Sequence, residues 1–308
     1  MAQQASANPT RAASAGANPS LDGADPVIAA AGDISCAPTD SAFDGHVSTK
    51  CQMRATLAQI QAGTFTALLP LGDEQYECGG ATAFSQSYHL IWGQENPIAW
   101  PAPGNHEYQS GTDCGGPGAV GYRQEFPTFP GVDGNLYYSF DVGTWHLISL
   151  NSNCSFVSCA KGSAQEQWLA NDLATHLNVC TVAYWHHPRF GSGAGHVLQN
   201  KTVAPFWDDL YASHADIVLN GHRHYYEALS PLNPAEQPDV NGIREFIVGT
   251  GGRSHGGGNN TVTHPQQIAF DRVHFGLLEL TLHPLSYDWA FVATDGTVIH
   301  SGSASCVV

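Results

Sequence analysis

The stretch that most constrains the fold is LLPLGDEQY, residues 68–76. A short apolar run that ends in glycine predicts a buried strand, and the glycine lets the backbone turn sharply after it. Asp73 would then lie at the carboxyl edge of a sheet, where open α/β sheets bind their ligands. A single strand followed by Gly-Asp is ordinary turn chemistry, so the weight of the pattern depends on its repetition.

The same pattern returns four more times. Apolar approaches at 26–31, 97–103, 179–185 and 216–219 each stop at a polar residue, and glycine stands before most of them. The five ends carry Asp33, Asp73, Asn105, His186, and His222 with His224. Five such ends in one chain predict a shared site. His222 and His224 alone would also fit a plain polar cluster, because alternate residues of an extended segment face the same side.

The segments between these ends favour an α/β class. Helical spacing or capping is seen at 48–62, 81–92, 163–177 and 202–213, and paired strands are expected at 136–142 and 145–151. A loop is expected at 108–134. The remainder is predicted to be β-rich, with strands at 244–249, 275–283, 285–292 and near 297.

Composition excludes several classes of partner. The chain has 308 residues, 42% of them apolar, and it shows no run of 18 apolar residues that would predict a membrane span. Eleven Lys and Arg against 27 Asp and Glu give a net charge of −16, which disfavours nucleic acid polymers and anionic membranes. Sixteen histidines provide material for metal sites.

Eight cysteines, with no C-x-x-C pair, favour disulfides and a secreted, periplasmic or otherwise extracytoplasmic location. The alternative is eight reduced, buried thiols. Cys154 with Cys159 and Cys180 with Cys306 are guessed as pairs. Cys36, close to Asp33, could instead contact a metal.

The first 24 residues are rich in Ala, Ser, Asn, Gln and Gly and are expected to be disordered. They lack a basic start followed by an apolar segment, so they do not resemble an intact signal peptide. A mature or trimmed form with a new Met1 would reconcile this with the cysteines.

The five blocks together resemble the calcineurin-like metallophosphoesterases. The blocks are Gly32-Asp33, Gly72–Tyr76, Gly104–Glu107, His186-His187-Pro188 and Gly221–His224. Two features are similar to the purple acid phosphatase branch: Ser35 replaces the histidine that many members carry two residues after the first Asp, and Tyr76 follows Asp73 by three. The run from His222 to Glu227 also resembles that branch. The resemblance covers about residues 26–255.

The resemblance implies a four-layer α/β/β/α sandwich with mixed sheets and a dinuclear metal centre. One metal ion would be held by Asp33, Tyr76 and His224, the other by Asn105, His186 and His222, and Asp73 would bridge them. A phenolate with carboxylate and imidazole suits Fe(III), whereas an amide oxygen with two imidazoles suits Zn, Mn or Fe(II). Tyr76 could instead only pack under its loop. The first ligand comes so early that an N-terminal β-sandwich, as in large plant-type forms, is not expected, so residues 25–308 are predicted to form one catalytic domain.

The implied activity is hydrolysis of small phosphate monoesters, with release of inorganic phosphate, by in-line attack of a metal-bound hydroxide. His106 is the leading catalytic acid, and His187 and His196 are further candidates. Glu107 is expected to orient His106 or a loop. The alternatives are a phosphodiesterase that acts on nucleotides or lipid head groups, and a metal-bearing binding protein without catalysis. The oligomeric state is left open.

Overall fold

The computed structural model describes residues 24–43, 49–129, 131, 134–177, 180–194, 198–255 and 261–307. The tail expected to be disordered, residues 1–24, lies outside this part of the chain except for Ala24, and so does His196. No helix in the described ranges is long and apolar enough to span a membrane.

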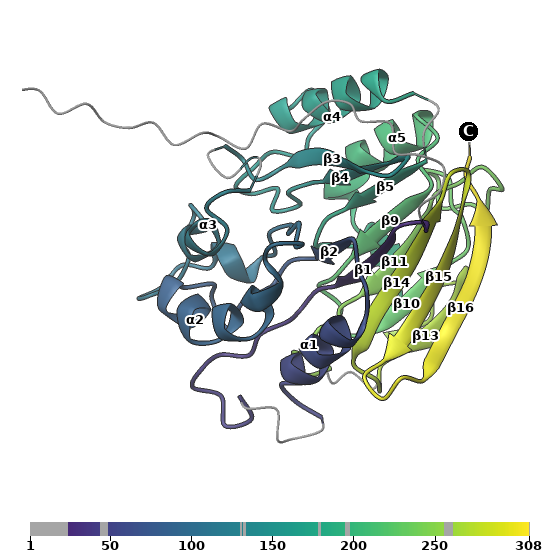
Figure 1. The fold of residues 1–308 in the computed structure, drawn as a ribbon. Helices are drawn as coiled ribbons and strands as arrows, with labels where there is room; N and C mark the ends of the chain where they lie inside the picture. The colour runs from purple at the N-terminus through teal and green to yellow at the C-terminus, as the bar shows by residue number, and fades with distance from the viewer. Residues whose placement is uncertain are drawn as a thin grey trace, which may run out of the picture.

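Two mixed sheets form the centre of the molecule (Figure 1). The five-stranded sheet has the order β16 (Val298–Ser305), β15 (Ser286–Ala293), β14 (Gly276–His283), β1 (Val27–Ala31) and β2 (Ala67–Pro70). The seven-stranded sheet has the order β13 (Gln267–Asp271), β10 (Tyr226–Leu229), β11 (Arg244–Val248), β9 (Ile217–Asn220), β5 (Thr181–Tyr184), β4 (Trp145–Ser149) and β3 (Tyr138–Val142). Two small ribbons pair β6 (Phe190–Gly191) with β8 (Leu198–Gln199), and β7 (Gly193–Ala194) with β12 (Thr261–Val262).

Helices cover the outer faces of the two sheets, as predicted. Along β5, Val182 and Tyr184 pack in the core shared by both sheets, whereas Ala183 packs in a second core with helices α4 and α5. Figure 1 shows α4 and α5 side by side over β3, β4 and β5, and α1 on the opposite side of the molecule. The helices are α1 (Met53–Ala62), α2 (Ala81–Gln86), α3 (Val120–Glu125), α4 (Ala164–Thr175) and α5 (Ala204–Ala212), with short 3₁₀ turns η1 (Tyr88–Leu90), η2 (Trp92–Glu95), η3 (His106–Tyr108) and η4 (Lys201–Val203).

The approach to Asn105 is extended but is not a regular strand. After a turn at 96–98, residues 98–102 run beside β2, where Trp100 N–H donates to the Leu68 carbonyl at 2.8 Å and Ala102 N–H donates to the Pro70 carbonyl at 2.9 Å. Pro97, Pro101 and Pro103 have no N–H and cannot complete a ladder. The loop predicted at 108–134 also differs from expectation, since it contains α3.

All eight cysteines form disulfides: Cys36–Cys51, Cys78–Cys114, Cys154–Cys159 and Cys180–Cys306. The two guessed pairs are confirmed. Because Cys36 is bonded to Cys51, its alternative role as a metal ligand is wrong.

A buried histidine joins β3, β4 and α4 beside the turn between β3 and β4. His146 lies 2.8 Å from Asp141 Oδ1 through Nδ1 and 2.7 Å from Asp172 Oδ2 through Nε2, and its ring stacks on His176 at 3.7 Å. A neutral imidazole has only one N–H, so this double contact requires the cation. Burial alone would lower the pKa of His146, but the hydrogen bonds that it donates to Asp172 and Asp141 raise it above its usual value.

This arrangement predicts that His146 stabilises the fold more at acidic than at alkaline pH. The contribution should be complete below the unfolded pKa of about 6.5 and lost as pH rises through the raised pKa of the folded protein. His146→Asn should therefore lower the free energy of unfolding by about 1–3 kcal/mol at pH 5.5 and by less at pH 9, measured by chemical denaturation. His283→Asn is the matched control, because His283 contacts Asp25 and Asp288 at a more exposed site. An equal loss at both pH values for His146→Asn would contradict the prediction.

Candidate metal centre

The first two predicted ligands follow adjacent parallel strands of the five-stranded sheet. Asp33 comes two residues after β1 and Asp73 three residues after β2, and both side chains are buried. Both residues have left-handed backbone conformations, with φ of 59° at Asp33 and 51° at Asp73. Such values are uncommon outside glycine and concentrate at functional sites, because the surrounding structure must impose them.

Tyr76, His224 and Asp33 meet on one side of Asp73. The Tyr76 hydroxyl lies 2.8 Å from Asp33 Oδ1, 3.0 Å from Asp73 Oδ2 and 2.9 Å from His224 Nε2. His224 Nε2 lies 3.1 Å from Asp33 Oδ1. Burial, with Asp33 and Asp73 close by, raises the pKa of Tyr76 well above its usual value. Two carboxylates, a phenol and an imidazole therefore face one point.

Asn105, His186 and His222 meet on the other side. His186 Nε2 lies 3.1 Å from Asn105 Oδ1, and His222 Nδ1 lies 3.0 Å from the same oxygen. Asp73 Oδ2 is 3.2 Å from His186 Nε2 and 3.0 Å from the Tyr76 hydroxyl. A single carboxylate oxygen thus contacts both halves of the cluster, as expected for a bridging ligand.

Two of the histidines are oriented by backbone carbonyls. His186 Nδ1 lies 2.9 Å from the Leu71 carbonyl, and His224 Nδ1 lies 2.7 Å from the Ser254 carbonyl. A carbonyl only accepts, so each Nδ1 carries hydrogen and each Nε2 is turned inward. Outer contacts of this kind are typical of metal-binding imidazoles.

Part of this cluster also has the spacing of ligand atoms that a metal ion requires. Ligand atoms of Asp73, His186 and His222 all lie within 4.8 Å of one another. In the described ranges, two of the other groups with this property contain cysteines that are held in disulfides, and the third is the His146 cluster. The protonated His146 of that cluster offers no lone pair to a metal.

Glu107 binds the backbone of the loop that carries Asp73, and this contact, rather than one with the His106 ring, is its role in the structure. Its carboxylate is buried and accepts hydrogen bonds from the backbone N–H groups of Asp73 at 3.0 Å, Gly104 at 2.8 Å and Gln75 at 3.2 Å. Burial and the nearby Asp73 raise the pKa of Glu107 to about 7. A Cβ atom at Gly104 would lie 2.1 Å from the Asp73 nitrogen, so only glycine permits this close approach.

His106 and His187, the two candidates for proton transfer within the described residues, lie beside opposite halves of the ligand cluster. The His106 ring packs on Tyr76 at 4.2 Å, with Nε2 3.8 Å from Asp73 Oδ2 and Nδ1 hydrogen-bonded to the Glu77 carbonyl. The His187 ring lies 4.5 Å from that of His222. Burial and the nearby His186 lower the pKa of His187 to about 3, so it is neutral. The third candidate, His196, lies outside the described residues.

Ser152 lies next to the cluster and was not predicted from the sequence. Ser152 hydrogen-bonds to His187 through Nδ1 at 2.9 Å and through the backbone N–H at 3.0 Å. The available signal was the polar run Asn151-Ser152-Asn153, which follows β4 and Leu150 in the same way as polar residues follow the five predicted strands.

A model of the calcineurin-like phosphoesterase family matches residues 28–226. The chain belongs to this family. Its curated relatives include a probable purple acid phosphatase 20 from Arabidopsis thaliana, 27% identical over 71% of this chain and 53% of that protein. They also include a probable inactive purple acid phosphatase 9 from the same plant, 26% identical over 72% of this chain and 40% of that protein.

Solved structures agree on the fold. The purple acid phosphatase PPD1 from yellow lupin seeds superposes with a TM-score of 0.71 at 20% identity, over 91% of this chain and 53% of that one. The resemblance to the phosphoesterases and the predicted α/β/β/α class are thereby confirmed. The chain spans about half the length of the curated relatives it matches.

The contacts of Glu107 predict that its carboxylate stabilises the candidate centre. Glu107→Gln keeps the shape but replaces one acceptor oxygen by an N–H₂ group that faces backbone N–H donors. We expect a loss of about 1–3 kcal/mol in the free energy of unfolding, measured by denaturation in urea, and weaker retention of metal, measured by elemental analysis after dialysis. Unchanged unfolding together with unchanged metal content would contradict this role.

Proposed function

We propose that the chain is a dinuclear-metal phosphatase that hydrolyses small phosphate monoesters. The observation that carries this proposal is the convergence of seven side chains of ligand type from five separate loops, with one Asp73 oxygen between the two halves. Membership of the phosphoesterase family and similarity to purple acid phosphatases support it. We also propose that residues 25–308 act as one catalytic domain, since both sheets contribute to one core.

The donor set fits two different metal ions. Asp33, Tyr76 and His224 would hold one ion, and Asn105, His186 and His222 the other, with Asp73 shared. The first set contains a phenol and suits Fe(III), and the second suits Zn, Mn or Fe(II). One carboxylate oxygen of Asp33 and one of Asp73 lie within 3.0 Å of the Tyr76 hydroxyl oxygen. Burial, together with the charges of Asp33 and Asp73, raises the pKa of Tyr76, and a cation among these oxygens would counter the repulsion between them.

When bound, the two ions would orient the phosphate, stabilise its developing charge and lower the pKa of a water molecule. The chain itself would supply the proton for the leaving oxygen. Because the Glu77 carbonyl accepts from His106 Nδ1, the proton that His106 can transfer is the one at Nε2 of the imidazolium. His106 is one-fifth exposed, so it can exchange protons with solvent.

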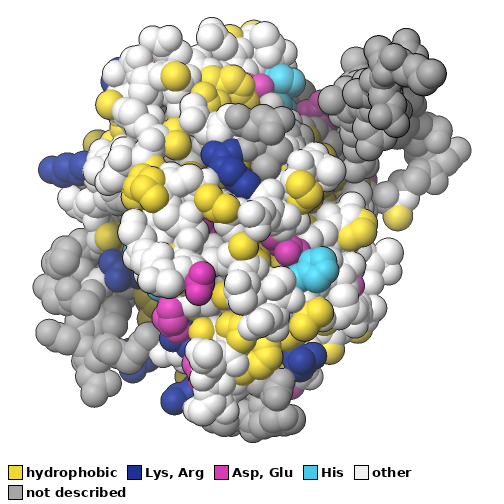
Figure 2. All heavy atoms as spheres, turned by 90° about the vertical axis from the view of Figure 1, so that its left-hand side faces the viewer, with side chains coloured by type: hydrophobic (Ala, Val, Ile, Leu, Met, Phe, Trp, Pro, Cys, Tyr) yellow, Lys and Arg dark blue, Asp and Glu magenta, His cyan; other side chains and the backbone are white. Residues whose placement is uncertain are grey.

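Charge and disulfides support a small substrate and an extracytoplasmic location. On the face in Figure 2, Lys and Arg side chains of described residues lie scattered among uncharged ones, and the whole chain carries a net charge of −16. Polymeric nucleic acids are bound through clustered basic residues. Four disulfides favour a secreted or periplasmic compartment.

A second function class is a protein that binds without catalysis. The relative named as probably inactive gives this alternative its support. Within enzymes, the alternative is a phosphodiesterase. Turnover of p-nitrophenyl phosphate against bis(p-nitrophenyl) phosphate separates the three: we expect hydrolysis of the monoester to dominate. Faster hydrolysis of the diester would favour the phosphodiesterase, and turnover of neither ester by protein loaded with both metals would favour the binding protein.

The position of Asp73 predicts that its loss disables the whole centre. Asp73→Ala removes the group shared by both ion sites, so kcat/KM should fall by more than about 100-fold and bound metal should fall below two ions per chain. Activity assays with elemental analysis test this. Two retained ions with near-normal turnover would be the contrary result.

The position of Tyr76 predicts a coloured protein when Fe(III) is bound. Electron transfer from phenolate to iron should give a visible absorption band and a violet or pink colour. Tyr76→Phe keeps the ring that packs against His106 and removes only the oxygen, so it should abolish the band and weaken iron binding with little loss of stability. Tyr211→Phe, which removes a hydroxyl bound to Asp239 on the surface, is the control. Confirmed Fe(III) in the unmodified protein without a visible band would show that Tyr76 is not a ligand.

A further inference from the structure

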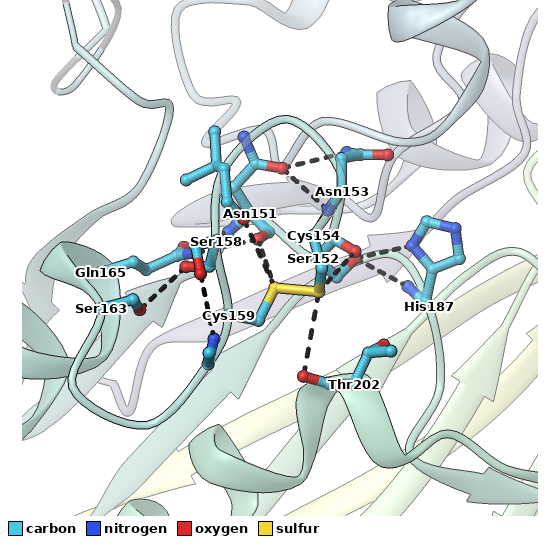
Figure 3. Close-up of a disulfide and its surroundings, with 12 residues drawn as sticks. Asn151, Ser152, Asn153, Cys154, Ser158, Cys159, Ser163, Gln165, His187 and Thr202 are labelled. Carbon is cyan, nitrogen blue, oxygen red and sulfur yellow. Dashed lines mark hydrogen bonds between the residues drawn. A yellow bond between two sulfur atoms is a disulfide. The ribbon is translucent and has the colours of Figure 1, made fainter.

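A loop closed by a disulfide follows β4. Because β4 and β5 are parallel, this loop lies at the same edge of the sheet as the candidate centre. This loop, residues 151–159 and here called the β4 loop, is closed by Cys154–Cys159 (Figure 3). Its first residue is fixed to α4: Asn151 N–H donates to Gln165 Oε1 at 2.7 Å, and the Asn151 carbonyl accepts from Gln165 Nε2 at 3.0 Å. The β4 loop therefore begins from a rigid point.

The β4 loop is also attached to the segment that carries Asn105. Asn153 Nδ2 donates to the Pro103 carbonyl at 3.1 Å, and Asn151 Nδ2 donates to the Tyr108 hydroxyl at 2.7 Å. These two contacts lie on either side of Asn105 in the sequence. Movement of the β4 loop relative to the candidate centre would break buried hydrogen bonds, which is costly.

Ser152 connects this fixed loop to His187. Its side chain is buried, and its Oγ accepts a hydrogen bond from the His187 backbone N–H at 3.0 Å. The same Oγ lies 2.9 Å from His187 Nδ1. Within the described part of the chain the hydroxyl has no other hydrogen-bond partner, so its hydrogen points to Nδ1. A ring nitrogen that accepts a hydrogen bond carries no hydrogen, so the ring hydrogen of His187 then resides on Nε2.

We propose that Ser152 is a positioning residue, which holds His187 in the Nε2–H tautomer so that this N–H donates to a phosphate group bound at the metal centre. Figure 3 shows the second ring nitrogen of His187 on the side of the ring away from Ser152. The ring lies 4.5 Å from that of His222 and 5.0 Å from that of His186, two candidate ligands. In the other tautomer, with hydrogen on Nδ1, Nε2 would present a lone pair to the phosphate and repel its oxygens. This inference rests on the proposed function.

The tautomer is measured directly by NMR. In zinc-loaded protein with ¹⁵N-labelled histidine, His187, assigned through the signals that vanish in His187→Asn, should show hydrogen on Nε2. Zinc is suitable because it has no unpaired electrons. In Ser152→Ala the two tautomers should mix. Ser158→Ala removes a hydroxyl from the exposed end of the same β4 loop and should leave the His187 signals unchanged. An unmodified protein with hydrogen on Nδ1, or a Ser152→Ala variant with an unchanged tautomer, would overturn the proposal.

The second measurement asks whether Ser152 acts through His187. Ser152→Ala should weaken binding of inorganic phosphate to the zinc-loaded protein about 2- to 10-fold, the range for one hydrogen bond. In a His187→Ala background the same change should have no further effect. An equal loss in both backgrounds would assign Ser152 a merely structural role. If Ser152→Ala does not fold, Ser152→Thr and Ser152→Val replace it, since they differ in the hydroxyl that the proposal requires.

Both readouts are independent of turnover. A protein that hydrolyses no phosphate ester, yet shows a Ser152-dependent tautomer and phosphate binding that depends on His187, would refute the proposed enzymatic function and retain this inference. An active enzyme in which Ser152→Ala changes neither readout would retain the function and refute the inference.

Discussion

The candidate centre depends on two buried carboxylates held at the ends of neighbouring parallel strands. β1 and β2 pair in parallel up to Ala31 and Pro70, and the ladder continues where Asp33 N–H donates to the Gly72 carbonyl at 3.0 Å. Burying like charges this close is unfavourable unless each is hydrogen-bonded or neutralised. One oxygen of each carboxylate accepts a backbone N–H, from His222 at 2.7 Å for Asp33 and from His106 at 2.8 Å for Asp73. The remaining oxygens face Tyr76, where a cation would neutralise them.

The donors for these carboxylates come from the loops that carry the other ligands. Because the backbone of His222 binds Asp33 while its ring faces Asn105, the same loop both stabilises one half of the centre and completes the other. The loop at Asn105 acts in the same way, since His106 N–H binds Asp73 and Glu107 binds the Asp73 backbone. The ligand loops therefore order one another, and removal of one side chain should be felt in both halves.

The local sequence pattern was enough to predict a strand and the site residue at its end. It was not enough to predict features that depend on contacts between residues far apart in the sequence. An apolar run that stops at a polar residue, with glycine before Asp33, Asp73 and His222 but not before His186, predicted where these side chains lie, because the strand and its turn are both encoded locally. β10 was missed because Tyr226–Leu229 follows the His224 turn without a break, and β13, Gln267–Asp271, because an edge strand carries mixed polarity. The contact between Ser152 and His187 joins residues 35 apart, and no periodicity reports such a pair.

The two proton-bearing histidines differ in environment, and the difference suits two separate tasks. His106 is partly exposed beside Tyr76, with its Nε2 3.8 Å from Asp73 Oδ2, so solvent can reach its ring. His187 is enclosed beside His186 and His222, where a positive charge is opposed by burial and by the neighbouring imidazole. Under the proposed function, a phosphate ester lying between them would meet the proposed proton donor His106 on one flank and the proposed hydrogen-bond donor His187 on the other. The asymmetry of the proposed metal ligands thus extends to the residues around them.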